Sequence, residues 1–121
     1  MSGKLIFNCT YGKEQPERAT LPFVAANIAA GAGQEAIVLL TIDAAWLGTE
    51  GGMDGIAQPG LPVLGDLYAE FLDNGGQVWV CGACAKPRGI TEEHLAKGAT
   101  IVGAAKVVEA VVAGAQTVAF A

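Results

Sequence analysis

The sequence predicts an α/β protein built on a five-stranded, mainly parallel sheet. Short apolar segments rich in β-branched residues alternate with longer segments of helical periodicity, which is the pattern of strands separated by helices. The run at 36–40 is apolar throughout, as is typical of parallel strands buried on both faces. The length of 121 residues fits one compact domain, so we expect residues 1–121 to form a single unit.

The amino-terminal part of the chain predicts two strands and the helix between them. Residues 4–9 are short and apolar, and residues 35–42 are apolar and partly β-branched. A helix is expected over 16–30, because Pro16 suits the first helical turn and glycines follow the last turn. Pro22 either kinks this helix or delays its start, since proline removes a backbone donor.

The rest of the chain continues the same alternation. The expected ranges are a glycine-rich connection at 43–60, a helix at 61–74, a strand at 77–81, a short helix beginning at Thr91, a strand at 100–102, a helix at 104–113 and a strand at 116–120. Thr91 is a suitable N-cap, because its side-chain oxygen accepts a hydrogen bond from the first helical turn. Long glycine-rich connections in compact domains are often functional, so 43–60 is a candidate cover for a site.

The composition excludes several classes of partner. The net charge of −5 and the pI near 4.6 argue against nucleic acid and against an anionic membrane surface. No apolar run approaches the roughly 20 residues that span a bilayer. Hydrophobic residues make up 52% of the chain and charged residues only 16%. Such a low charge content on a small chain predicts that another subunit covers part of its surface.

Three cysteines, an odd number, fit poorly with a disulfide framework, and we expect a reducing cytoplasm. The first residues, from Met1, contain no apolar signal-peptide segment. Zinc would need about four ligands, and the soft candidates Cys9, Cys81, Cys84 and His94 match no standard spacing. Phosphate-loop and dinucleotide motifs are missing from the sequence. The sequence therefore calls for no metal and no cofactor.

The most informative feature is the pair Cys81 and Cys84, which directly follows the strand at 77–80. Ligands of open α/β sheets bind outside the carboxyl ends of the strands, where these thiols are expected. Lys86 and Arg88 come next, and nearby positive charge favours the reactive thiolate over the thiol. Free cysteines are often merely buried. The position, spacing and flanking cations together favour a reactive pair.

The loops after the first two strands lead to the same edge of a parallel sheet. We therefore expect Cys9, Tyr11, Asp43 and Lys86 to line a pocket around the thiols. Cys9 is either a third thiol of the site or, as we favour, a buried strand-end residue. Tyr11 lines the pocket or caps the core. Asp43 organises a turn, which is common for aspartate at a strand end, or acts as an acid or base.

The segment at 78–91, VWVCGACAKPRGIT, resembles the DsrE/DsrF-like family of sulfur-relay proteins. Tyr11-Gly12 after the first strand and residues 40–43 and 98–104 fit the same pattern. The resemblance implies a three-layer α/β/α domain and homo- or hetero-oligomers, often trimers or hexamers. It also implies that a cysteine after a central strand carries sulfur as a persulfide.

Cys81 stands at the family's interval before Arg88 and Gly89, so the resemblance makes it the carrier. Cys84 is an additional thiol, which either resolves a persulfide into a disulfide or is incidental. The predicted function is thus a cytoplasmic sulfur carrier, rather than a turnover enzyme, that takes sulfur from a donor protein and gives it to an acceptor. Arg88 and Lys86 would stabilise negative charge on the terminal sulfur. The alternatives are a dithiol redox protein and a non-catalytic oligomeric module that binds a small ligand.

Overall fold

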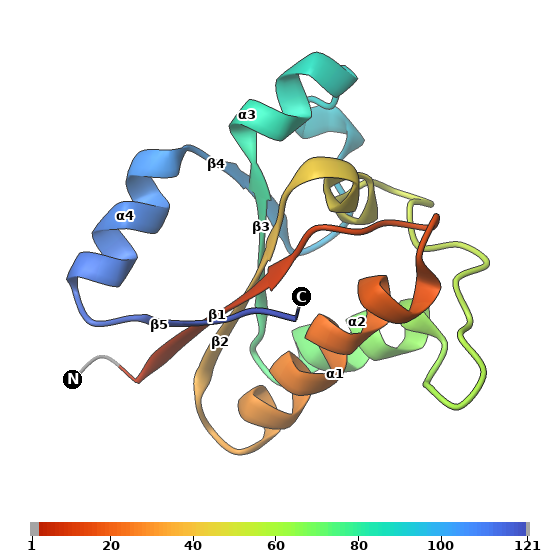
Figure 1. The fold of residues 1–121 in the computed structure, drawn as a ribbon, viewed down its shortest axis with the longest axis horizontal. Helices are drawn as coiled ribbons and strands as arrows, with labels where there is room; N and C mark the ends of the chain where they lie inside the picture. Colours follow the sequence, from red (N-terminus) through yellow and green to blue (C-terminus); the bar gives the residue numbers. More distant parts are fainter. Residues whose placement is uncertain (1–2, 121) are drawn as a thin grey trace.

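The computed structural model describes residues 3–120, and five parallel strands form one sheet in them (Figure 1). The order across the sheet is β4-β3-β2-β1-β5, so the first three strands along the chain are neighbours near its centre. This arrangement confirms the predicted α/β fold with a parallel sheet. The strands are β1 (Lys4–Cys9), β2 (Glu35–Leu40), β3 (Gln77–Cys81), β4 (Ala99–Val102) and β5 (Gln116–Val118).

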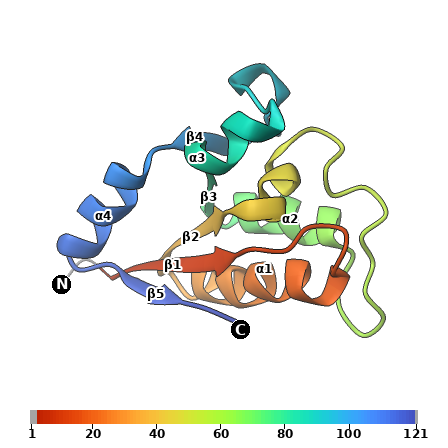
Figure 2. The ribbon, with the colours of Figure 1, turned by 45° about the horizontal axis from the view of Figure 1, so that its top comes forward.

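Helices cover both faces of the sheet, giving three layers (Figures 1 and 2). On one face lie α1 (Pro16–Gly31) and α2 (Leu64–Asp73), and on the other lies α4 (Ala104–Val112). The short α3 (Gly82–Ala85) continues directly from β3. Three turns of 3-10 helix complete the structure: η1 (Ile42–Gly48), η2 (Lys86–Arg88) and η3 (Glu92–His94). Within residues 3–120 no helix has the length and apolar character needed to cross a bilayer.

The larger core lies between the sheet and the pair α1 and α2. Helix α1 turns Ala19, Phe23 and Ala26 inward at helical spacing. Phe23 packs against two rings of α2, with centroids 5.9 Å from Tyr68 and 6.1 Å from Phe71. These two helices therefore contact each other as well as the strands beneath them.

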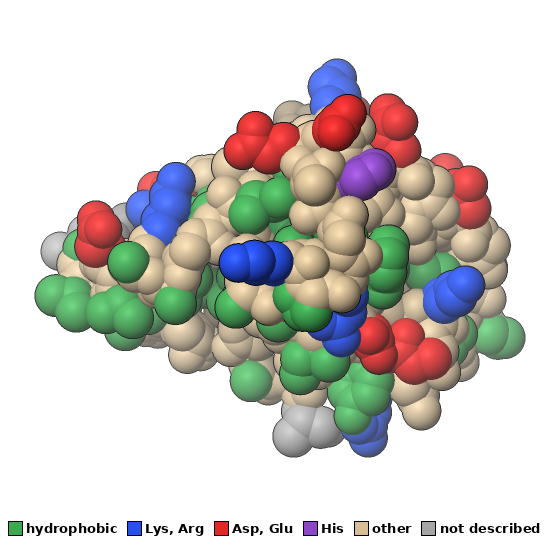
Figure 3. Space-filling view, turned by 90° about the horizontal axis from the view of Figure 1, so that it is seen from above, with side chains coloured by type: hydrophobic (Ala, Val, Ile, Leu, Met, Phe, Trp, Pro, Cys, Tyr) green, Lys and Arg blue, Asp and Glu red, His purple; other side chains and the backbone are tan. Residues whose placement is uncertain are grey.

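A smaller core lies on the opposite face, under α4. Trp79 of β3 and Leu39 of β2 are buried there together with Ala110 of α4. The outer side of α4 carries the exposed apolar side chains of Val111 and Val112, and Lys106 and Glu109 of the same helix are exposed as well. Hydrophobic side chains gather at this end of the molecule in the space-filling view (Figure 3).

The structure departs from the sequence prediction at several boundaries. Helix α1 begins at Pro16, so Pro22 lies inside it and does not delay its start. Strand β2 ends at Leu40 rather than 42, because the chain turns into η1. Helix α2 begins only at Leu64, because Pro62 disfavours a helical conformation at Leu61 and the backbone of Val63 is not helical, with a ψ of 128°. No helix was predicted between the strand at 77–81 and Thr91, whereas α3 and η2 occupy 82–88.

Ile42 supplies a test of local strain at the start of η1. Its φ of 55° lies in the left-handed region, where a β-branched residue costs roughly 1–2 kcal/mol. Its side chain is half exposed, so little burial is lost on removing it. We expect Ile42→Gly to raise the free energy of unfolding by about 0.5–1 kcal/mol in urea titrations. A decrease of similar size would show that the strain is absent or that the Ile42 side chain matters more.

Candidate functional site

Cys81 lies at the junction of β3 and α3, as the last strand residue and the residue that precedes the first helical turn. Side chains alternate along a strand, so Cys81 shares the face of Trp79, which is the α4 side. Its half-buried side chain lines a hollow of about 220 Å³ between the sheet edge and α4. The other lining residues are Leu39, Val102, Gly103, Ala104, Val107 and Val108.

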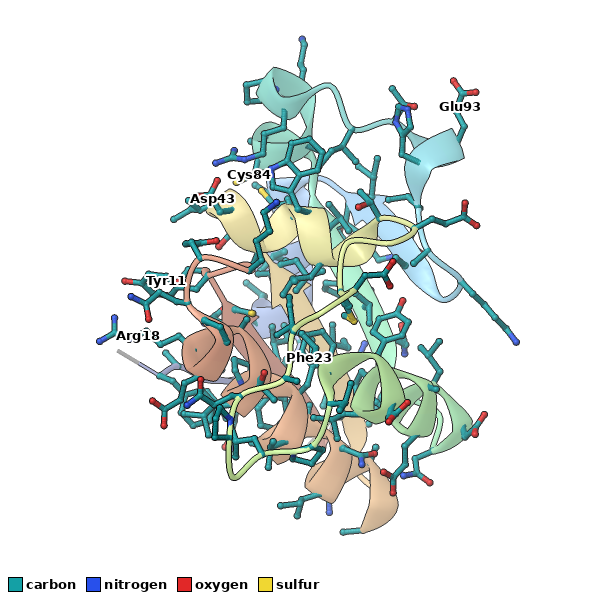
Figure 4. The ribbon with its side chains drawn as sticks, turned by 90° about the vertical axis from the view of Figure 1, so that its right-hand side faces the viewer. Tyr11, Arg18, Phe23, Asp43, Cys84 and Glu93 are labelled. Carbon is teal, nitrogen blue, oxygen red and sulfur yellow. The ribbon has the colours of Figure 1, made fainter. Side chains whose placement is uncertain are left out.

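Cys84 lies on the other side of the same helical turn. It packs against the larger core, the one that α1 and α2 cover. In Figure 4 it lies beside Asp43 at the carboxyl edge of the sheet. Cys81 and Cys84 are both free and half buried. Cys81 thus precedes the short helix α3 and Cys84 lies within it, and the two thiols face different cores.

Arg88 holds this helix to the neighbouring η1. Its Nη2 lies 2.9 Å from Oδ1 of Asp43, and its Nη1 donates to the carbonyl oxygen of Cys84 at 3.1 Å. The Arg88 side chain is 24% exposed and the Asp43 side chain 50%, so solvent screens the ion pair only in part. Arg88 and Asp43, predicted as site residues from separate loops, are therefore brought into contact. Gly89, with a φ of 71°, ends η2 in a conformation that favours glycine.

The remaining predicted site residues do not surround Cys81. Lys86 is exposed at the start of η2. Tyr11 is half buried at the edge, where its hydroxyl oxygen accepts a hydrogen bond from Arg18 Nη1 at 3.0 Å. The Arg18 guanidinium also lies 5.0 Å from the Tyr11 ring centroid, a cation–π contact (Figure 4). Arg18 was not among the predicted site residues, although its place in the first turns of α1, seven residues after Tyr11, was a usable signal.

Cys9 has the buried position that we favoured for it. It is 1% exposed, and its Sγ donates to the carbonyl oxygens of Tyr11 at 3.6 Å and Ala19 at 3.7 Å. Burial raises the pKa of the Cys9 thiol to about 12. Because the thiolate is the nucleophile, Cys9 is inert near neutral pH.

This burial predicts a loss of stability in alkaline solution. Desolvation raises the pKa of Cys9 from 9.0 to about 12 and that of Tyr68 from 10.0 to about 12. The unfolded chain releases these protons at lower pH than the folded protein. The resulting stability is thus complete below pH 9 and is lost as the pH rises toward 12. Urea titrations between pH 8 and 11 should show a shallower decline for Cys9→Ala and for Tyr68→Phe than for wild type. Equal slopes would contradict the assignment.

The glycine-rich segment borders a second hollow and does not cover the first. This hollow, of about 600 Å³, adjoins η1, and no cysteine is among the residues that line it. The segment runs along the α1 and α2 side of the molecule, away from α4 (Figure 1). The lining residues are Lys13, Glu14, Asp43, Trp46, Thr49, Glu50, Gly51, Gly52 and Asp54. The segment at 43–60, suggested as a cover for a site, therefore contributes no residue to the lining of the Cys81 hollow.

Metal binding finds no support at this edge. Among residues 3–120, no three histidine, cysteine, aspartate or glutamate side chains come together as a metal site would require. His94, the only histidine of the chain, is exposed on η3. Its Nδ1 accepts the backbone N–H of Thr91 at 3.0 Å, so it caps its own turn. His94 therefore has a local structural role.

The sequence profile of the DsrE/DsrF-like family matches residues 3–120. The chain belongs to the DsrE/DsrF-like family. A relative, "Uncharacterized protein MJ0760" of Methanocaldococcus jannaschii, is 35% identical over 95 residues, which are 78% of this chain. The match covers 34% of that protein, so this family domain spans about a third of its length.

Two solved structures share the DsrE-like fold. The ychN protein of E. coli superimposes with a TM-score of 0.69 at 14% identity, covering 97% of this chain and 98% of that one. MTH1491 of Methanobacterium thermoautotrophicum, described as a protein of unknown function, gives a TM-score of 0.74 at 13% identity with the same coverage. At these identities the likeness establishes the fold alone. Family membership suggests a function of the sulfur-relay type.

Proposed function

We propose that the protein carries sulfane sulfur as a persulfide on Cys81, in the cytoplasm, between a donor and an acceptor protein. The observation that supports this most is the position of Cys81 at the mouth of a hollow. Cys9 is buried, and Cys84 packs against the larger core. Cys81 is thus the thiol that lines a hollow with room for a second sulfur.

The proposed step is a thiol–persulfide exchange. The Cys81 thiolate attacks the outer sulfur of a donor R–S–SH, and a new S–S bond forms as the donor S–S bond breaks. The donor leaves as R–S⁻ with the bonding electron pair, and the proton stays on the outer sulfur. Cys81 then holds –S–SH, and an acceptor thiolate removes the outer sulfur by the same exchange. No external oxidant or reductant is needed.

The neighbouring residues have two roles in this proposal. Arg88 positions the Cys81-bearing turn through Asp43 and the Cys84 carbonyl, and it adds positive charge at the edge. Lys86, which was predicted to stabilise an anionic sulfur, is exposed at the start of η2 and contributes only to the positive charge of this edge. Cys84, the candidate resolving thiol, would release sulfide by attacking the inner sulfur of the Cys81 persulfide. Because it faces the larger core, we expect the persulfide to persist until an acceptor removes its outer sulfur.

Two other functions remain as competing hypotheses. A dithiol couple would oxidise Cys81 and Cys84 to a disulfide, but these thiols face different cores. A binding module would use a hollow instead. The 600 Å³ hollow has the size typical of small-molecule sites and includes the exposed Trp46, which is the specific observation in favour of that function.

We also propose that the protein forms a homo-oligomer, a trimer or hexamer. The apolar outer side of α4, with Val112 82% exposed, supports this, because such patches commonly mark subunit contacts. Light scattering at micromolar concentration should give a multiple of the 12.3 kDa chain mass. A monomer under those conditions would refute the prediction.

Intact-protein mass spectrometry after exposure to polysulfide, with and without reductant, separates these functions. A reductant-sensitive gain of about 32 Da that Cys81→Ser abolishes and Cys9→Ser keeps would indicate the persulfide carrier. A loss of two hydrogen atoms that requires both Cys81 and Cys84, with polysulfide as the oxidant, would indicate the dithiol couple. No change in mass would favour the binding module.

A further inference from the structure

The hollow beside Cys81 is formed by three parts of the chain that are distant in sequence. Leu39 comes from β2, Cys81 from the end of β3, and the other lining residues from 102–108, where β4 leads into α4. Apart from Cys81, its lining consists of aliphatic side chains and one glycine. Its volume of about 220 Å³ is below the 300–1,000 Å³ typical of drug-sized ligands. The space therefore fits a small group of a few heavy atoms.

The charged residues near this hollow do not line it. On α4, Lys106 places its Nζ 5.3 Å from the ring centroid of Trp79, and Glu109 is exposed. Arg88 on the other side of the turn is paired with Asp43. An anion entering the hollow would thus lose water without gaining a hydrogen-bond donor from any lining side chain except the Cys81 thiol. Transfer of an uncompensated charge into such surroundings is unfavourable.

We propose that this hollow is a donor subsite that selects uncharged, low-molecular-weight persulfides with a short apolar substituent. This inference rests on the proposed function, which it sharpens by naming the donor class. The substituent R of R–S–SH would lie against Leu39, Val102 and Val107, with the outer sulfur at Cys81. The apolar lining favours the protonated persulfide, in which the outer sulfur is the electrophile. Oxyanion donors such as thiosulfate are disfavoured.

The chemistry of the subsite can be tested without any sulfur transfer. Methanethiosulfonates modify a thiolate by forming Cys–S–S–R and releasing methanesulfinate, and they come as matched neutral and anionic reagents. The ethyl and 2-sulfonatoethyl reagents would be applied to the reduced protein, and peptide mass spectrometry would give rates at Cys81 and Cys84. Rates with a free small thiol correct for intrinsic reactivity. We expect Cys81 to prefer the neutral reagent at least tenfold, and Cys84 to show a much smaller preference.

Two lysine substitutions on α4 provide a matched pair. Val108 is 60% exposed and lines the hollow, whereas Val112 is 82% exposed one turn later and does not. Val108→Lys should reduce the preference of Cys81 for the neutral over the anionic reagent about threefold, because the lysine ammonium then attracts the entering anion. Val112→Lys adds the same charge to the same apolar surface, so it controls for changes in assembly. It should leave the preference within experimental error of wild type.

The outcomes separate the subsite from the carrier function. Equal corrected rates for the two reagents at Cys81, or equal effects of the two lysines, would overturn the subsite even if Cys81 carries sulfur. A second copy seated over the hollow would protect Cys81 from both reagents alike, which would also overturn it. Loading with polysulfide tests the carrier function separately. If Cys81 prefers the neutral reagent but takes up no sulfur from polysulfide, the carrier function is refuted and the apolar subsite is retained.

Discussion

Replacing Phe23 by alanine is expected to lower the free energy of unfolding by about 3–5 kcal/mol, the largest effect on stability that the structure predicts. Phe23 is fully buried in α1, and its ring contacts Tyr68 and Phe71 of α2. Its removal leaves a cavity where two helices and the sheet meet. Phe120→Ala is the matched control, since Phe120 is 38% exposed and should lose far less.

Urea unfolding followed by circular dichroism would measure both variants. Because small domains have total stabilities of about 5–15 kcal/mol, Phe23→Ala is expected to lose a large share of the total stability. Similar losses for Phe23→Ala and Phe120→Ala would contradict the packing described for the larger core.

Gly48→Ala is expected to destabilise the protein by about 1–3 kcal/mol and to disturb the candidate site. Gly48 is buried at the end of η1, and a Cβ atom there would lie 2.5 Å from Val80 Cγ2 and 3.2 Å from Leu40 Cδ1. The clash would push η1 away from β3. Asp43 lies in η1 and pairs with Arg88, so the turn that carries the thiols should become less well fixed.

Gly65→Ala is the control for this substitution. Gly65 lies in α2, and no atom is within 4 Å of the position of its added Cβ. Alanine there should stabilise the helix by about 0.5–1 kcal/mol. Unfolding titrations, together with the rate of Cys84 alkylation, would measure both effects. Unchanged stability and unchanged alkylation in Gly48→Ala would show that η1 can move without consequence.

Much of the sheet could be predicted from the sequence because its strands carry a strong local signal. The runs at 4–9 and 77–81 are apolar and end at polar or small residues, and their observed bounds are those predicted. The short turns could not be predicted in this way. Helix α3 has only four residues, and η1 begins at Ile42 in a backbone conformation that β-branched residues rarely adopt. Tertiary packing, rather than local preference, decides such segments.

The sequence predicted where in the fold the candidate site lies, but not how its residues contact one another. The strand-end rule placed Cys81, Cys84 and Asp43 at one edge of a parallel sheet, where the structure also has them. The sequence did not indicate that Arg88 would pair with Asp43, because 45 residues separate them. Nor did it indicate the hollow, whose wall on α4 depends on which face of that helix meets the sheet. Contacts between distant segments are set by packing, which a periodic pattern does not specify.

Cyanolysis tests the central claim, that Cys81 carries the transferable sulfur, most directly. Cyanide removes sulfane sulfur as thiocyanate, which can be counted per chain after the reduced protein is loaded with polysulfide and freed of excess donor. The account predicts about one thiocyanate per chain for wild type, Cys9→Ser and Cys84→Ser, and none for Cys81→Ser. Equal thiocyanate from wild type and Cys81→Ser would contradict it.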